Sequence, residues 1–234
     1  MIDQAIQVNS HIAQVGEGGD FGLNVGRHIA SARQKQLMDG IIVEAVRLTA
    51  AAADARMAGA QAPVVTNSGS GNQGITTTMP IVSAARSLHI PEERMFRAVT
   101  LSNLVAIYIH ASFGLLSGLC GATVAATGAA CGLTWLLGGD FDQVGYAINN
   151  MLGDVSGMVC DGAKADCALK ISTCVWTAFL CAWMALSGVS VKPAEGIVEL
   201  DPEHTIRNFN RLGNEGSPAL DKLIMDIMLG KTVV

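Results

Sequence analysis

Apolar residues recur along most of this chain at intervals of three or four, the period of an α-helix that buries one face. Alternating runs typical of strands are confined to short pieces such as Pro63–Thr66. The pattern predicts helices at residues 3–14, 24–38, 40–57, 75–88, 92–113, 115–137, 141–152, 168–187, 202–212 and 217–229. Glycine-rich breaks separate many of these helices, at Gly16–Gly19, Ser68–Gly74, Gly138–Gly139 and Gly153–Gly162.

Proline and acidic residues mark two of the helix starts. Pro91 precedes Glu92 and Glu93, and Ser217 precedes Pro218. Proline suits the first helical turn, and acidic side chains there complement the helix dipole. No internal repeat or linker divides the sequence. We therefore predict an all-α fold, a single domain over residues 1–234 with central apolar helices surrounded by amphipathic ones.

Two long segments contain no Asp, Glu, Lys or Arg: Leu104–Gly139 and Ile171–Val191. Each is long enough to cross a bilayer. The first contains His110 and several glycines, and it runs into Asp140 with no basic residue to anchor it on the cytoplasmic side. We favour central helices of an all-α domain for both segments, because such helices are apolar all round. Membrane spans are the alternative.

Composition and charge argue against some classes of protein function for this chain, nucleic-acid binding among them. The 234 residues are 50% hydrophobic, which is enough to bury a core without disulfides. Fifteen Lys and Arg face 20 Asp and Glu, giving a net charge of −5, so a broad basic surface for nucleic acid is not expected. The chain starts Met1-Ile2-Asp3-Gln4, unlike a signal peptide, and we expect it in the cytoplasm.

The segment Thr66–Gly74 is composed of small or uncharged polar residues and precedes a predicted helix. Its Gly69–Gly74 part fits the G-x-G-x-x-G pattern of dinucleotide-binding folds. That pattern requires a βαβ unit, and no second strand follows. The backbone amides and side chains of this segment suit a carboxylate ligand at a helix N-terminus. A capped surface turn is the simpler interpretation, and both stay open.

Six cysteines are present, at positions 120, 131, 160, 167, 174 and 181. In a reducing compartment these are thiols or metal ligands rather than disulfides. Cys174 and Cys181 lie in an apolar segment, and we interpret them as core residues. On a helix Cys160 and Cys167 would stand about 10.5 Å apart, whereas a loop at Gly162 would let them approach. No C-x-x-C motif occurs, so spacing alone leaves a metal site open.

Four runs of residues carry a resemblance to a known family: Asp54–Met57, Thr66–Pro80, Ala106–His110 and Gly153–Lys164. Together they resemble the L-cysteine desulfidase family, which is related to the α chain of the iron–sulfur L-serine dehydratases. The resemblance spans nearly the whole chain. It implies an all-α domain that binds a 4Fe-4S cluster through three cysteines, and the matching positions here are Cys120, Cys160 and Cys167.

The resemblance also implies a β-eliminating lyase. Three protein thiolates leave one iron without a protein ligand, and an open iron acts as a Lewis acid on the leaving group of the substrate. L-cysteine would give pyruvate, ammonia and sulfide, and L-serine is the alternative substrate. The resemblance assigns substrate binding to the polar loop, from which we select Asn67, Ser68, Ser70, Asn72 and Gln73, and we add His110 as a candidate. A lone histidine in an apolar run is more often a core residue.

One family motif is missing from this sequence. Family members have an N-terminal portion with a Cys-Thr-Glu-Pro motif, whose cysteine is the proposed acid/base, and no such motif occurs here. Elimination needs a base within hydrogen-bond reach of the Cα proton. We therefore expect a missing N-terminal portion or a separate partner chain to complete the enzyme, and the isolated chain to be inactive. A non-catalytic subunit of the same fold is the alternative. The apolar helices also favour a homo-oligomer.

Overall fold

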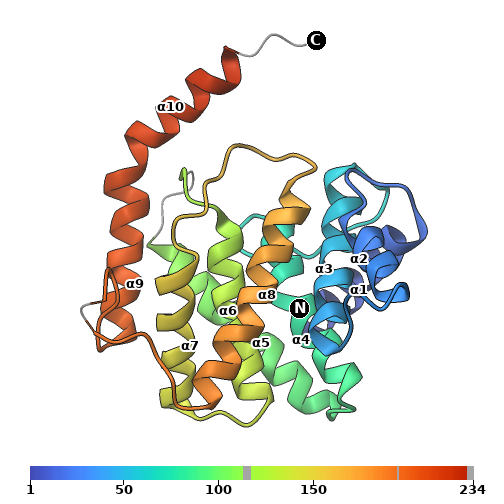
Figure 1. Cartoon of the computed structure of the whole chain (residues 1–234), viewed down its shortest axis with the longest axis horizontal. Helices are drawn as coiled ribbons and strands as arrows, with labels where there is room; N and C mark the ends of the chain where they lie inside the picture. Colours follow the sequence, from blue (N-terminus) through green and yellow to red (C-terminus); the bar gives the residue numbers. More distant parts are fainter. Residues whose placement is uncertain (113–116, 194, 231–234) are drawn as a thin grey trace.

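A computed structural model describes residues 1–112, 117–193 and 195–230 of the chain, and Figure 1 shows that they form a bundle of helices. These residues contain no strand. The elements are α1 (Ile2–Gly18), α2 (Val25–Gln34), α3 (Ile41–Met57), α4 (Gly71–Ser87), α5 (Glu92–Ala111), α6 (Gly121–Leu136), α7 (Phe141–Asp154), α8 (Cys167–Leu186), α9 (Pro202–Arg211), a π-helical turn (Leu212–Gly216) and α10 (Ser217–Leu229). The predicted all-α fold is confirmed, and the dinucleotide-binding alternative is excluded because the described residues lack its βαβ unit.

Helix α6 is the centre of the bundle and contacts α4, α5, α7 and α8. Nearly all of its residues are buried, and most are Ala, Gly or Thr. A Cβ at Gly132 would lie 2.8 Å from the carbonyl oxygen of Ala98, so this glycine lets α5 approach α6 closely. Small side chains therefore explain how an apolar central helix packs against four neighbours.

Most predicted helix bounds agree with the structure to within three residues. Helix α1 continues through the predicted break at Gly16, because that glycine faces the backbone of Ala51 in α3 and is a packing residue rather than a helix end. Helix α4 begins at Gly71, inside the predicted loop, since Ser70 caps it. Helix α6 begins at Gly121, after the predicted start at residue 115. Residue 113 of one predicted helix and residues 115–116 of the next lie outside the described residues.

The two charge-free segments form different structures. The described part of Leu104–Gly139 divides between the end of α5 and the buried α6. Among the described residues, α8 alone is long and apolar enough to cross a membrane, and half of its apolar window is buried within the bundle. Its outward face exposes Leu169, Trp176, Leu180 and Trp183.

The last helix leaves the body of the bundle. Helix α9 packs on α7, and the π-helical turn continues it into α10, which projects from the bundle in Figure 1. The hydroxyl of Ser217 accepts a hydrogen bond from the backbone N–H of Gly118 (2.6 Å). The Cε of Met228 would lie 3.4 Å from a Cβ on Gly162. Helix α10 therefore passes beside the two segments that carry Cys120 and Cys160.

Candidate active site

Two segments far apart in the sequence pair next to the start of α6. The N–H of Cys120 donates to the carbonyl of Met158, and the N–H of Cys160 donates to the carbonyl of Gly118, both at 2.8 Å. Between them Leu119 and Val159 form an isolated antiparallel bridge. Each cysteine thus belongs to a short extended piece fixed by the backbone of the other. This pairing brings two of the three predicted cluster ligands together.

The thiols of these two cysteines affect the pKa of each other. The neighbouring Cys120 thiol lowers the pKa of Cys160, because it stabilises the thiolate there. The same interaction, together with burial, raises the pKa of Cys120. Both cysteines are half-buried and neither forms a disulfide. The pair can therefore hold a negative charge on Cys160, the form in which cysteine binds metal.

Gly162 connects this pair to Cys167, the first residue of α8. Its φ of +97° breaks the chain direction between Cys160 and Cys167. The carbonyl of Gly162 accepts a hydrogen bond from the Cys167 thiol at 3.8 Å. The predicted loop at Gly162 is confirmed. Within the described ranges, however, no three Cys, His, Asp or Glu side chains are already arranged to hold a metal ion.

Charged side chains hold the segment around Cys160 in place. The ammonium group of Lys170 in α8 donates to the carbonyl of Val159 (2.9 Å) and to Asp161. Lys164 pairs with Asp161 as well, and with Asp166 at 3.3 Å. Hydrogen bonds from Lys164 and Lys170 hold the pKa of Asp161 well below its usual range. The loop between Cys160 and Cys167 is therefore fixed by ion pairs at both of its ends.

The polar loop before α4 is a tight turn. Asn67 and Ser70 exchange two backbone hydrogen bonds, of 3.1 and 2.9 Å, around Ser68 (φ +48°) and Gly69 (φ +79°). These angles belong to a type I′ turn. Asn67 is buried, and its side chain donates to Asn103 of α5 (2.9 Å). The surface-turn and ligand-site interpretations both remain, since the turn is well formed and also ends at a helix N-terminus.

Gln73 connects this loop to the cysteines. Its side chain is buried, and its Oε1 has no hydrogen-bond partner among the described residues. A Cβ on Gly121 would lie 2.8 Å from its Nε2. Gly121 is the first residue of α6 and directly follows Cys120. The N-terminal ends of α4 and α6 therefore meet at Gln73, and an anion placed there would face the positive ends of two helix dipoles.

Comparison with known proteins decides the family. Residues 1–226 match the family of the serine dehydratase alpha chain. The chain belongs to this family. It is 47% identical over 229 residues to a UPF0597 protein of Oleidesulfovibrio alaskensis, covering 97% of this chain and 54% of that one. It is 44% identical over 230 residues to a UPF0597 protein of Parabacteroides distasonis, covering 98% and 54%. The chain spans about half the length of the curated relatives it matches.

In this member of the serine dehydratase alpha chain family, the other candidate residues of the polar loop make local contacts. Ser70 caps α4 by accepting from the N–H of Gln73 (3.4 Å). Ser68 donates to Asn67, and Asn72 donates to the sulfur of Met57 (3.2 Å). His110 lies half-buried in the last turn of α5, two turns beyond Asn103, and its part in the site stays a prediction.

The remaining cysteines lie in the core. Cys131, Cys174 and Cys181 are all buried, as was predicted for the last two. Cys131 faces the backbone of Val144 at 3.9 Å. Cys174 contacts the sulfur of Met158 at 3.6 Å. Burial raises the pKa of each of these three thiols to about 12, so they are protonated at neutral pH.

Asn103 is a residue of this region that sequence reasoning missed. It accepts from both Asn67 and Thr77 through its side-chain oxygen, and it donates to the carbonyl of Val99. It therefore fixes the turn against α5. Its signal in the sequence is an amide within the apolar half of a predicted helix, a position where an unpaired polar group is costly.

Proposed function

We propose that this chain is the cluster-binding and substrate-holding part of a β-eliminating lyase of the cytoplasm. The reaction converts L-cysteine and water to pyruvate, ammonia and sulfide, and L-serine is the alternative substrate, which loses its hydroxyl instead. The observation that carries the proposal is the backbone pairing that places Cys120 next to Cys160, beside the polar loop that carries Gln73. Membership in a family named for serine dehydratase supports the same reaction class.

The chemical type of the side chains at this site fits an iron–sulfur cluster. Cys120, Cys160 and Cys167 supply three thiols: backbone pairing holds the first two side by side, and the third donates to the carbonyl of Gly162, two residues after Cys160. Soft thiolates are the ligands that such clusters require. These three residues would hold a 4Fe-4S cluster, which when bound supplies a Lewis acid for the leaving group.

The polar loop would bind and orient the amino acid. Backbone N–H groups in the first turn of α4 and the amide of Gln73 are suited to the substrate carboxylate, because they present donors at a helix N-terminus. The Oε1 of Gln73, which has no hydrogen-bond partner in the described part of the chain, is suited to accept from the substrate ammonium group. Asn67, Ser68 and Asn103 act as positioning residues, since they hold the turn that carries these groups. His110 is a further candidate for substrate contact.

The base that removes the Cα proton is not assigned to this chain. No Cys-Thr-Glu-Pro motif occurs in the sequence, and the relatives are about twice as long. We propose that a further polypeptide portion, joined or separate, supplies this base. Added to the present chain, that portion is expected to confer lyase activity.

The test is anaerobic loading of the purified chain with iron and sulfide. We expect a brown protein with iron and acid-labile sulfide bound, and loss of both in Cys160→Ala. Cys181→Ala, a buried cysteine elsewhere on α8, is the matched control and should load normally. A wild-type chain that stays colourless would overturn the proposal and favour a non-catalytic subunit. A second measurement uses the loaded protein together with the missing portion. It compares the release of pyruvate and sulfide from L-cysteine with the release of pyruvate from L-serine.

A further inference from the structure

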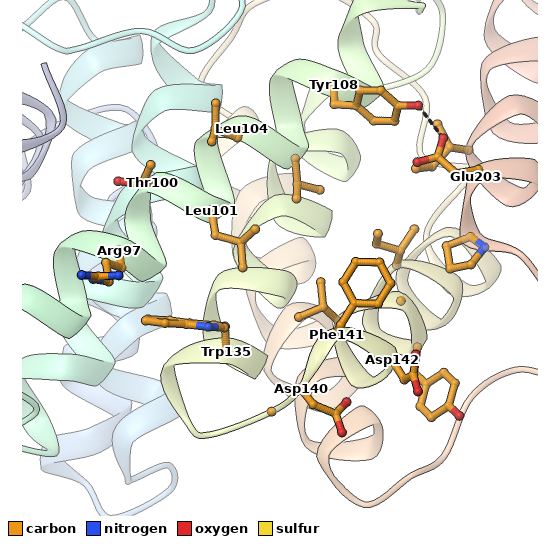
Figure 2. A pocket seen from close by; sticks show the side chains of 18 of the residues that line it. Arg97, Thr100, Leu101, Leu104, Tyr108, Trp135, Asp140, Phe141, Asp142 and Glu203 are labelled. Carbon is orange, nitrogen blue, oxygen red and sulfur yellow. Dashed lines mark hydrogen bonds between the residues drawn. The ribbon is translucent and has the colours of Figure 1, made fainter.

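A large groove lies between α5, α7 and α9, and none of its lining residues belongs to the site above (Figure 2). Its volume is about 1740 Å³. Sites for small molecules occupy about 300–1,000 Å³, so this groove is large enough for a piece of polypeptide. Trp135, near the end of α6, lines it, whereas Cys120 precedes the start of that helix, about 22 Å away along the axis. The groove and the cysteine site are therefore separate.

The walls of the groove are apolar and exposed. Phe96, Leu104 and Tyr108 follow the outward face of α5, and Phe141 stands on the α7 side, 90% exposed. Figure 2 shows Tyr108 pointing toward Glu203 of α9, with which it forms a hydrogen bond. With Thr100 between Phe96 and Leu104, these residues recur every four positions along α5 and form the kind of ridge that packs into the groove of another helix. From Phe96 to Tyr108 this ridge is about 18 Å long, the length of a helix of about 12 residues.

The rim of the groove is strongly acidic. Of the described residues that line the groove, seven are acidic and one, Arg97, is basic, so together they carry a net charge of −6, against −5 for the entire chain. Several of the acids have a local role, since Asp140 and Asp201 cap α7 and α9 and Glu92 lies in the first turn of α5. Each helix N-terminus offsets only about half a charge, so three of them remove about a quarter of the total. The groove stays negative.

This charge decides between occupants. A second copy of the chain carries a net charge of −5, and its projecting α10 has two acidic residues and one basic, so it would meet like charge. Phospholipid surfaces are commonly anionic and would be repelled as well. An amphipathic helix with an apolar face flanked by Lys and Arg matches both the walls and the rim.

We propose that this groove is the docking site for a basic amphipathic helix of a partner polypeptide. The apolar face of that helix packs against the α5 ridge and Phe141, and its basic residues pair with acids such as Glu92 and Asp142. The inference does not depend on the lyase reaction, because it rests on the shape and charge of a different surface.

The experiment uses two synthetic helical peptides of about 14 residues with the same apolar face. One carries Lys on its flanks and the other Glu, and binding to the full chain is followed by fluorescence anisotropy of a labelled peptide. We expect the Lys peptide alone to bind, and added salt to weaken it. Equal binding of the two peptides, or no binding of either, would overturn the proposal.

Matched variants locate the binding. Leu104→Ser in the groove should weaken the Lys peptide about tenfold, the loss typical of a buried anchor. Leu180→Ser removes a similarly exposed leucine from α8 (56% against 59% exposed) and should leave the affinity unchanged. Asp142→Lys should weaken binding, whereas Asp226→Lys on α10 should not. Equal effects within either pair would contradict the assignment. Two further results would contradict it: self-association of the chain that Leu104→Ser abolishes, or binding to anionic vesicles that Leu104→Ser abolishes. The first would identify a second copy of the chain as the occupant of the groove, and the second a lipid surface.

Discussion

The side-chain amide of Gln73 lies against Gly121, where a Cβ on that glycine would meet its Nε2 at 2.8 Å. The contact joins the loop that would hold the substrate to the residue after Cys120. The N-terminal ends of α4 and α6, the buried amide of Gln73 and the residue Cys120 thus meet at Gly121. The relationship is a sensitive place to test whether the loop and the cysteines act as one site.

Gly121→Ala should displace the Gln73 amide, because the new Cβ would lie 2.8 Å from Nε2. A flexible side chain can move aside, so we expect Tm to change by no more than a few degrees. We expect the Kd for L-serine, measured by calorimetry on protein loaded with iron and sulfide, to rise about fivefold or more, as loss of a hydrogen bond predicts. Gly157→Ala, at a glycine with open space around it, is the control. Unchanged affinity in both variants would separate Gln73 from substrate binding.

The third cluster ligand is tested by a pair of cysteines two turns apart on α8. Cys167→Ser should lose iron as completely as Cys160→Ser does. Cys174→Ala should retain iron and lose about 1 kcal/mol of stability through packing against Met158. Bound iron and sulfide per chain are the measurement. If Cys167→Ser kept its iron while Cys174→Ala lost it, the ligand set would be Cys120, Cys160 and Cys174 instead.

Close packing of α5 on α6 predicts a large stability effect at Gly128. A Cβ there would fall on the carbonyl oxygen of Ser102, which is backbone and cannot rotate away. Gly128→Ala should therefore lower the free energy of unfolding by about 2–3 kcal/mol, although alanine favours helix. Urea unfolding followed by circular dichroism measures this change. Gly18→Ala, in open space at the end of α1, should change stability by less than about 1 kcal/mol.

Asp54 predicts a pH dependence of stability. It is 1% exposed, its Oδ2 accepts from the N–H of Gly26 (3.0 Å), and its Oδ1 has no hydrogen-bond partner among the described residues. Burial raises the pKa of this carboxyl from 3.8 to about 6. The folded state therefore holds the proton more tightly than the unfolded state, and this contribution is complete below pH 3.8 and is lost as the pH rises through 6.

In Asp54→Asn this loss should disappear. Between about pH 4 and pH 7 the wild type should lose about 2–3 kcal/mol more stability than the variant does. Asp142→Asn, at an exposed carboxyl, is the control and should follow the wild type. Parallel stability profiles for wild type and Asp54→Asn would mean that Asp54 is already ionised well below pH 6.

The helices were predictable because their signals are local. Apolar spacing, Pro91 with its following acids, and the glycines at 138 and 139 each act within a turn or two. Gly16 shows the limit of this reasoning, since its role depends on Ala51 of another helix and the sequence offers only a helix-breaking residue. The start of α4 was misplaced for a similar reason, because Ser70 caps a helix whose first residue is a glycine.

The candidate site was predictable only in part. The loop at Gly162 and the core positions of Cys174 and Cys181 follow from local polarity, whereas the choice of Cys120 depended on resemblance to a family. The pairing of Gly118–Cys120 with Met158–Cys160 is a tertiary contact, and the spacing of residues along the sequence does not predict it. Asn103 and the acidic groove were missed for the same reason, since each becomes meaningful when separate helices come together.

The backbone bridge between Leu119 and Val159 bears on how the proposed cluster would enter the protein. Because main-chain hydrogen bonds and the surrounding helices already hold Cys120 next to Cys160, iron is not needed to bring these two residues together. Small zinc domains, by contrast, fold only as the metal enters. The main chain therefore sets the spacing of two of the three proposed ligands, and the proposed cluster would be inserted between positions that the fold already fixes.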